Sequence, residues 1–305
     1  MRAGVEPSVR ELPAEKLSAL RRNIFGPGQA AIADWHRFPW HHDQRGEVQS
    51  DKVQSSQALA IDVFGTIKAS SDASRDAVMD AIACSAGLSV GGPWQVDLEW
   101  CDPQNLLREP TPTQVDVLVE SPRTILVIEC KFTEAPGSCS QTARMRSGRA
   151  IGQRQCNGRY EPQSHPATGV TSHCVLSGKR IRYWDVIPDV FALDPLQVYD
   201  PCPFARGAYQ WMRNMVLAAE LGRTSGKASR CMIAFAAGGN FPTEKKIRNS
   251  NWLPPLRTDR LAPFAMSFQQ IAELAAQVDG DIRWTDLSHW VDSKLDAVRS
   301  KTRSG

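Results

Sequence analysis

An apolar hairpin interrupted by charged residues is the feature that most constrains this chain. The segment VDVLVESPRTILVIECKFTE, residues 115–134, contains two runs of strand-forming residues separated by the turn sequence SPRT. The turn predicts an antiparallel hairpin with a four-residue loop, in which Glu120 faces Ile125. One face of the hairpin is then expected to carry the apolar residues Val115, Val117, Val119, Leu126, Ile128 and Cys130.

The opposite face of this hairpin gathers charge at one end. The predicted register places Asp116 across from Glu129, and Lys131 projects on the same side. Carboxylates about 5 Å apart across two strands repel one another unless a cation lies between them. Mg²⁺ or Mn²⁺ is the expected ion, and Lys131 would orient a water or stabilise developing charge. The alternative is a salt bridge from Lys131 to either carboxylate at a strand end.

The remaining pattern predicts an α/β fold with a central mixed β-sheet flanked by helices. Helices are expected at residues 14–25, 55–68, 77–86, 203–222, 267–278 and 285–298, with Pro203 in the first turn of the fourth helix and Gly222 at its end. Strands are expected at residues 96–100, in the hairpin and at residues 229–240. The segment IRYWDVI, residues 181–187, reads as a short strand within an irregular stretch. The predicted organisation is an N-terminal helical and aromatic extension (1–54), a core (55–240) with a long insertion rich in Cys and Arg (135–201), and a C-terminal helical segment packed on the core (241–305).

With Asp116 in one strand and Glu129-x-Lys131 in the next, the chain resembles the PD-(D/E)XK, or restriction endonuclease-like, nuclease superfamily. The resemblance spans residues 55–240 and implies an αβββαβ core with a metal-dependent phosphodiesterase site. Asp116 and Glu129 would bind the metal and Lys131 would assist the attacking water. Residues Pro112 and Thr113 precede Gln114 here, whereas the superfamily often has Pro directly before the Asp.

The resemblance also suggests further residues that contribute to the metal site. Members often add an acidic residue from the first helix or strand, for which Glu99 is the candidate; Asp97 shares its strand and Glu109 lies in a loop. A polar residue from the helix before the fourth strand often approaches the site. Gln210 and Arg213 are therefore expected to contact a phosphate or water, although a solvated helix face explains them equally well.

Eight cysteines in a chain with no secretory signal favour reduced thiols or metal ligands. Cys84, Cys101, Cys130 and Cys231 fall in expected helices and strands and are interpreted as small core residues. The other four are separated by 16, 17 and 27 residues without a CxxC pair, and either bind Zn²⁺ or an iron–sulfur cluster or are unrelated thiols. These four are Cys139, Cys156, Cys174 and Cys202.

The insertion also carries a run of arginines without an acidic residue from 141 to 160. Because the run directly follows the Glu-x-Lys strand, contact with nucleic acid is favoured over a merely solubilising surface. DNA is the expected partner, although RNA is left open. The arginines are Arg144, Arg146, Arg149, Arg154 and Arg159.

The formal net charge of +3 does not by itself indicate a nucleic-acid binder. No run of about 18 apolar residues is present, so no membrane partner and a cytoplasmic location are expected. The His-rich run around His41 is interpreted as surface rather than a metal site. A DNA endonuclease in repair, restriction or defence is the leading hypothesis, with a homodimer as one way to cut both strands. The alternative is a catalytically inactive DNA-binding accessory protein that keeps the fold.

Overall fold

A mixed β-sheet forms the centre of the computed structural model, which describes residues 11–249 and 253–303. Within these residues the sheet has five strands in the order β1-β2-β3-β6-β7. The first three are antiparallel, whereas β6 and β7 continue parallel to β3. The strands are β1 (Gln95–Cys101), β2 (Gln114–Glu120), β3 (Thr124–Lys131), β6 (Ala228–Phe235) and β7 (Phe264–Ser267).

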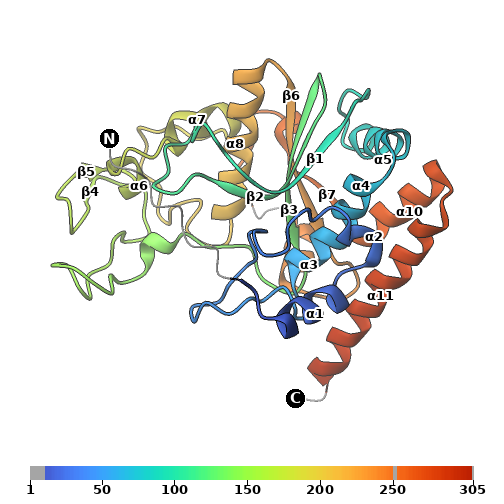
Figure 1. Cartoon of the computed structure of the whole chain (residues 1–305). Coiled ribbons are helices and arrows are strands. Elements are labelled where there is room, and N and C mark those ends of the chain that lie inside the picture. The colour runs from blue at the N-terminus through green and yellow to red at the C-terminus, as the bar shows by residue number, and fades with distance from the viewer. Residues whose placement is uncertain (1–10, 250–252, 304–305) are drawn as a thin grey trace, which may run out of the picture.

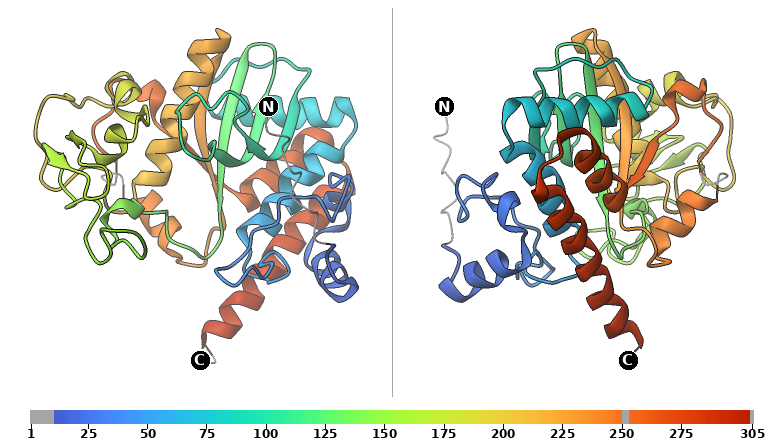
Figure 2. Two further views of the ribbon diagram at one scale, coloured as in Figure 1. Left: turned by 60° about the vertical axis from the view of Figure 1, so that its left-hand side comes forward. Right: turned by 90° about the vertical axis from the view of Figure 1, so that its right-hand side faces the viewer.

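Helices cover both faces of this sheet, which makes three layers (Figures 1 and 2). On one face lie α3 (Ser56–Ala60), a π-helical turn η1 (Ile61–Gly65), α4 (Thr66–Ala69), α5 (Asp72–Ser85), α10 (Phe268–Asp279) and α11 (Ile282–Arg303). On the other face lie α7 (Tyr183–Val190) and α8 (Tyr209–Ser225). The predicted α/β class is confirmed, and α5, β1, β2, β3, α8 and β6 follow one another in the expected αβββαβ order.

Successive side chains of the hairpin alternate between two hydrophobic cores, one on each face of the sheet. Val117 and Val119 of β2 pack toward α5 and α10, whereas Leu118 packs toward α7 and α8. The hairpin register is also as predicted, since Glu120 pairs with Ile125 and Ser121 closes the turn by donating its N–H to Thr124 O. The strands of the hairpin therefore have two buried faces, which explains their nearly continuous apolar sequence.

Three expectations about local structure are wrong. Residues 181–187 do not form a strand but enter helix α7, because Tyr183, Trp184 and Ile187 recur at helical spacing and bury one side. Helix α8 begins at Tyr209 rather than in the turn of Pro203. It passes through Gly222 and ends before Gly226, whose φ of 72° is the left-handed conformation that terminates helices.

Strand β7 was not predicted, and the expectation that Cys84 and Cys101 are core residues is wrong. β7 is four residues long and too short to show a period. Cys84 and Cys101 are exposed, unlike the buried Cys130 and Cys231, because they lie on the outer side of α5 and at the end of the edge strand β1.

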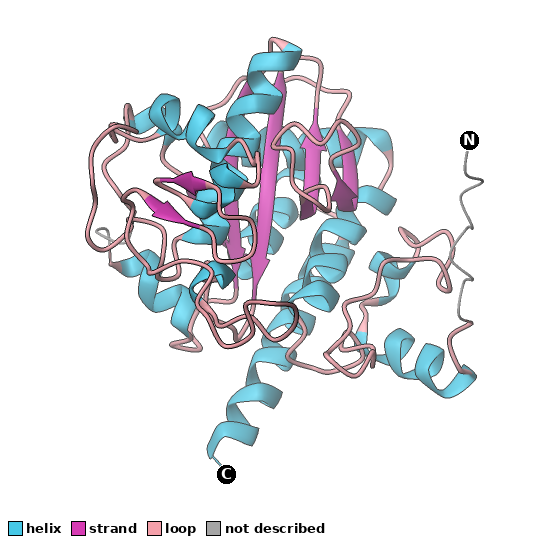
Figure 3. Ribbon diagram, turned by 90° about the vertical axis from the view of Figure 1, so that its left-hand side faces the viewer, coloured by secondary structure: helices cyan, strands magenta, loops and turns pink. Residues whose placement is uncertain are grey.

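The insertion lies beside α8 on the side away from α10 and α11 (Figure 1), and Figure 3 shows its loops and two short strands beside the central sheet. Its regular elements are η2 (Ser140–Thr142), the two-stranded sheet β4 (Gln163–Ser164) and β5 (Thr171–Ser172), α6 (Val175–Gly178) and α7. Beyond β6 follow α9 (Pro242–Arg248) and the short η3 (Asp259–Leu261). Most of the insertion is loop, so its order depends on side-chain contacts rather than on backbone ladders.

The N-terminal segment packs on the lower side of the helical layer that contains α3 and α11 (Figure 1). It contains α1 (Ala14–Asn23), α2 (Gly26–Gln29) and a loop that carries His41. Its core consists of residues such as Leu20, Ile24 and Trp40. None of the described helices is long and apolar enough to cross a membrane.

Candidate active site

Two acidic residues face each other across the first two strands. Leu98 pairs with Val117, and Trp100 pairs with Val115, so the register places Glu99 of β1 opposite Asp116 of β2. Glu99 is the acidic residue that the sequence suggested, whereas Asp97 is half exposed and pairs with Lys68. Glu99 is thus buried at the end of the strands where Asp116 lies, whereas Asp97 lies on the outer surface.

The backbone is distorted where these two residues meet. Glu99 has a φ of 51°, a left-handed conformation that a residue with a Cβ adopts only at some cost in free energy. The alternation of faces also breaks here, because Val117 packs toward α5 but Val115 packs toward α8. The expectation that Val115 shares the face of Val117 is therefore wrong. The distortion turns both acidic side chains toward a common space.

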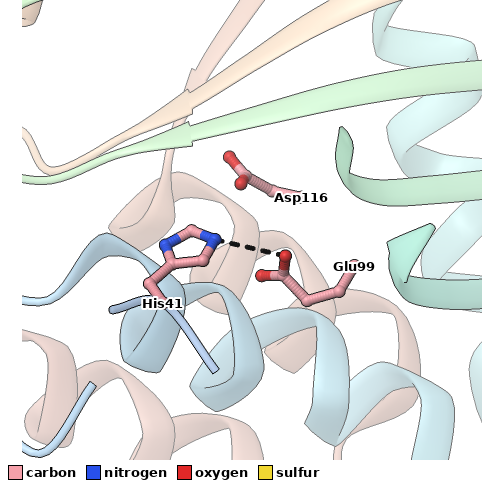
Figure 4. A group of neighbouring side chains, drawn as sticks. All are labelled: His41, Glu99 and Asp116. Atoms are coloured by element: carbon pink, nitrogen blue, oxygen red, sulfur yellow. Dashed lines mark hydrogen bonds and ion pairs between the residues drawn. The ribbon is translucent and has the colours of Figure 1, made fainter. Parts of the chain in front are cut away.

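His41 completes this group from the N-terminal loop. Its Nε2 lies 3.2 Å from Glu99 Oε2, and Figure 4 shows the three side chains of His41, Glu99 and Asp116 converging. One ligand atom from each lies within 4.8 Å of the others, and among the described residues this is the one group of three His, Cys, Asp or Glu side chains so arranged. His41 is on the surface, as predicted, but its place beside a carboxylate pair was missed. Nothing in the local sequence signals a contact with a residue 58 positions away.

Asp116 is also tied to the third strand. Its Oδ2 accepts a 2.6 Å hydrogen bond from the backbone N–H of Cys130. The paired residues of β2 and β3 run from Glu120–Ile125 to Val117–Ile128, so the ladder stops one position before Asp116 and Glu129. The side chain of Asp116 thus replaces a backbone acceptor at the point where the strands separate.

Glu129 and Lys131 form the second half of the site. Lys131 Nζ lies 2.7 Å from Glu129 Oε1, and both side chains are almost fully buried. Glu129 Oε1 also accepts a hydrogen bond from Gln210, and Oε2 accepts one of 2.6 Å from Asn214. Gln210 was a sequence candidate; Asn214 was missed, although it lies one helical turn later on the same side of α8.

A cavity of about 350 Å³ joins the two halves. Arg213 also lines it and donates a 3.4 Å hydrogen bond to Gln114 O. Glu109, the loop alternative, lines the cavity too but accepts hydrogen bonds from Thr113 and Tyr183. The other members of the lining that matter for chemistry are His41, Glu99, Asp116, Glu129 and Gln210.

The charges in this cavity are not balanced, because acidic groups outnumber basic ones. Burial, and then the charge of Glu129, raise the pKa of Asp116 well above its usual range, although Lys131 opposes the shift. Burial alone would lower the pKa of Lys131, but Glu129 and Asp116 outweigh it and raise the pKa. For His41, burial would lower the pKa, but the hydrogen bond that it donates to Glu99 and the charge of Glu99 outweigh burial and raise the pKa. Negative charge therefore dominates the site.

Family membership can be assigned once this site is set in its fold. The family described as restriction endonuclease associating with ARP matches residues 20–275. The chain belongs to this family. The matched region includes His41 and Glu99 as well as the hairpin and α8, so it contains every residue of the cavity. The restriction endonuclease-like family points to a nuclease. No curated protein and no solved structure matches the chain.

The five arginines of the insertion lie outside the cavity lining and are all exposed. Arg144 and Arg154 form an isolated antiparallel bridge that closes the loop between them. Arg159 forms an ion pair with Asp200. Among the described residues, no carboxylate pairs with the other four. The loop is anchored beside the site, because Gly137 donates its N–H to Gln210 Oε1.

Proposed function

We propose that the protein is a metal-dependent nuclease of the PD-(D/E)XK type that hydrolyses phosphodiester bonds in DNA, acting as an endonuclease in repair, restriction or defence. The observation that carries the proposal is the convergence of Glu99, Asp116 and Glu129 on a single cavity, with the ammonium of Lys131 2.7 Å from Glu129 Oε1. Glu99, Asp116 and Glu129 leave an excess of negative charge beside Lys131, which a divalent cation would neutralise. Membership in a restriction endonuclease-like family supports the same chemistry.

The donor set fits Mg²⁺ or Mn²⁺. These ions take oxygen ligands and commonly use one or two carboxylates together with waters and substrate phosphate. Glu99 and Asp116 would hold the ion, with Glu129 as a further oxygen donor in the same cavity. His41 would orient Glu99 through its hydrogen bond, as partners of ligating carboxylates often do.

A bound ion would polarise the phosphate and lower the pKa of a water. Burial lowers the pKa of Lys131, but Glu129 and Asp116 raise it further, which favours the ammonium form in the metal-free site. The ammonium would stabilise the negative charge that develops on the phosphate oxygens. Gln210 and Asn214 hold Glu129 in place from α8, which fixes the ammonium in turn.

The exposed arginines support DNA as the substrate. Arg144, Arg146, Arg149 and Arg154 lie on one loop, carry no ion pair with a described residue, and follow the strand of Lys131. Guanidinium groups bind phosphates in a sequence-independent way and would hold a backbone near the cavity. Arg213 lines the cavity and would contact a phosphate there.

Cleavage of supercoiled and linear DNA by Lys131→Ala tests the proposal. The turnover with Mg²⁺ or Mn²⁺ is expected to fall at least about 10²-fold, because the lost charge acts on the transition state. DNA binding should change less than about twofold, since binding depends mainly on backbone phosphate contacts. The matched control is Lys227→Ala, which removes a lysine paired with Glu120 at the other end of the hairpin.

The outcomes separate two functions. Metal-dependent cleavage that EDTA stops and Lys131→Ala abolishes supports the nuclease. DNA binding by the wild type without cleavage under any metal would replace it with a nuclease-fold accessory protein. Nicking of closed circular DNA distinguishes an endonuclease from an exonuclease, because a closed circle has no end.

A further inference from the structure

Four cysteines that are far apart in the sequence surround one small cavity in the insertion. The cavity has a volume of about 30 Å³ and lies between the insertion and the start of α8. Its lining also includes Tyr160, Trp184 and His173. The four cysteines in the lining are Cys139, Cys156, Cys174 and Cys202. Burial raises the pKa of the Cys139 and Cys202 thiols, and the neighbouring cysteines of this group add to the rise.

A backbone N–H two residues later lies near each of these sulfur atoms. Gly158 donates to Cys156 at 3.4 Å, and the N–H groups of Gln141, Leu176 and Phe204 oppose the rise that burial causes in the pKa of Cys139, Cys174 and Cys202. The Ser177 N–H and the side chain of Trp184 act on Cys174 in the same direction. A neutral thiol is a weak acceptor, so four repeated donors suit thiolates, whose charge they would stabilise.

Other groups near the cavity fit negative charge as well. Lys179 lies close enough to affect Cys139 and Cys174, and it is held by the side chains of Gln141 and Gln155. His173, next to Cys174, has a buried Nδ1 that finds no hydrogen-bond partner among the described residues. Metal-bound thiolates carry net negative charge, which a nearby ammonium offsets.

We infer that Cys139, Cys156, Cys174 and Cys202 are the ligands of an iron–sulfur cluster. Four thiolates and a central cavity suit either a cluster or a zinc ion by ligand type. A tetrahedral zinc with bonds of about 2.3 Å would draw the sulfur atoms to about 3.8 Å from one another and leave no cavity between them. Among the described residues, no three of these sulfur atoms lie within 4.8 Å of one another. A [4Fe–4S] cluster separates its cysteines by binding each to a different iron.

The position of this centre suggests what it does. Cys139 and Cys156 flank the loop whose base is closed by the bridge between Arg144 and Arg154. Cys174 and Cys202 belong to segments that pack against α7 and α8. The cluster would therefore fasten the base of the arginine loop to the core, in a region with few backbone ladders. The inference does not depend on the nuclease proposal.

The metal content of the full-length wild-type chain, purified without oxygen, tests the inference directly. About four irons and four sulfides per chain are expected, together with visible absorption of thiolate-bound iron. Cys156→Ser should lose iron, sulfide and absorption. The matched controls are Cys84→Ser and Cys101→Ser, which change exposed cysteines outside the cavity and should retain all three signals.

The wild-type measurement keeps the test decisive even if a variant fails to fold. One zinc ion per chain without sulfide would overturn the cluster. A soluble wild-type chain with neither metal, after expression with added iron and after reconstitution with iron and sulfide, would overturn the four-thiolate centre as well. Retention of the cluster in Cys156→Ser would remove Cys156 from the ligand set and so contradict the assignment.

Discussion

Two groups of buried charges in this protein differ in how completely they are balanced. The first is the pair of Asp62 in η1 and Lys294 in α11, whose Oδ2 and Nζ lie 2.5 Å apart. Asp62 also accepts hydrogen bonds from Phe25 N and Trp290 Nε1, and Lys294 donates to Asn23 O. Burial raises the pKa of Asp62, but Lys294 and these donors oppose it. One negative charge meets one positive charge.

The second group has a surplus. Glu99, Glu109, Asp116 and Glu129 line one cavity together with Arg213, Lys131 contacts Glu129, and His41 contacts Glu99. The group opens into a cavity, whereas both side chains of the first pair are buried. Burial without neutralisation is costly, so a protein keeps such a surplus where a cation is to be bound. The difference teaches that charge balance, rather than burial alone, separates a structural pair from a candidate site.

Breaking the balanced pair should have the largest effect on stability. Lys294→Met leaves Asp62 buried without its partner, and we expect the free energy of unfolding to fall by about 3–5 kcal/mol in urea titrations. The double variant Asp62→Leu with Lys294→Met should recover much of this loss, because no unpaired charge remains. Unchanged stability in Lys294→Met would show that the pair does not hold η1 to α11.

Removing one negative charge from the unbalanced group should stabilise the metal-free protein, which is the opposite of the effect expected from Lys294→Met. Because the pKa of Asp116 is raised on folding, the folded chain holds this proton more tightly than the unfolded chain. Its carboxyl costs nothing below its unfolded pKa and destabilises the metal-free fold as pH rises through that range. Asp116→Asn should therefore be more stable than the wild type at pH 7 without metal, and about equal at pH 3.

A bound metal ion should make the wild type more stable than Asp116→Asn. Mn²⁺ at about 100 times its Kd is expected to stabilise the wild type by about 2.7 kcal/mol, and to stabilise Asp116→Asn far less. Thermal unfolding with and without the ion measures both. The matched control is Asp97→Asn, which changes an exposed acidic residue of the same strand as Glu99. Equal metal stabilisation of Asp116→Asn and wild type would place the ion elsewhere.

The smallest effect is expected from replacing the exposed arginines of the insertion. Replacing Arg144, Arg146, Arg149 and Arg154 by Ala should weaken DNA binding about tenfold or more and lower the slope of log K against log salt by up to about 3.6. Turnover at saturating DNA should stay nearly unchanged, in contrast to Lys131→Ala. The control removes four exposed cations elsewhere: Arg22, Arg123, Arg260 and Lys301. If the control weakens binding equally, the loop has no special role.

Local sequence determined much of this protein. The apolar pattern and the SPRT turn set the register of β2 and β3, because slipping by one residue would move every side chain of a strand to the other face of the sheet. The same reasoning placed Asp116, Glu129 and Lys131 at one end of the hairpin. Helix and strand order followed from periodicity, and it failed at residues 181–187, where a helical pattern with large aromatic residues resembles a strand.

Tertiary structure decided the rest. The left-handed backbone at Glu99 lies in a strand and has no local signal, yet it turns Glu99 toward Asp116. His41 reaches Glu99 across 58 residues, and Asn214 reaches Glu129 across 85. The four cysteines have irregular spacings, so their convergence depends on how the insertion packs. Periodicity reports neighbours along one element, whereas contacts between distant segments depend on the sum of all packing, which no single stretch of sequence contains.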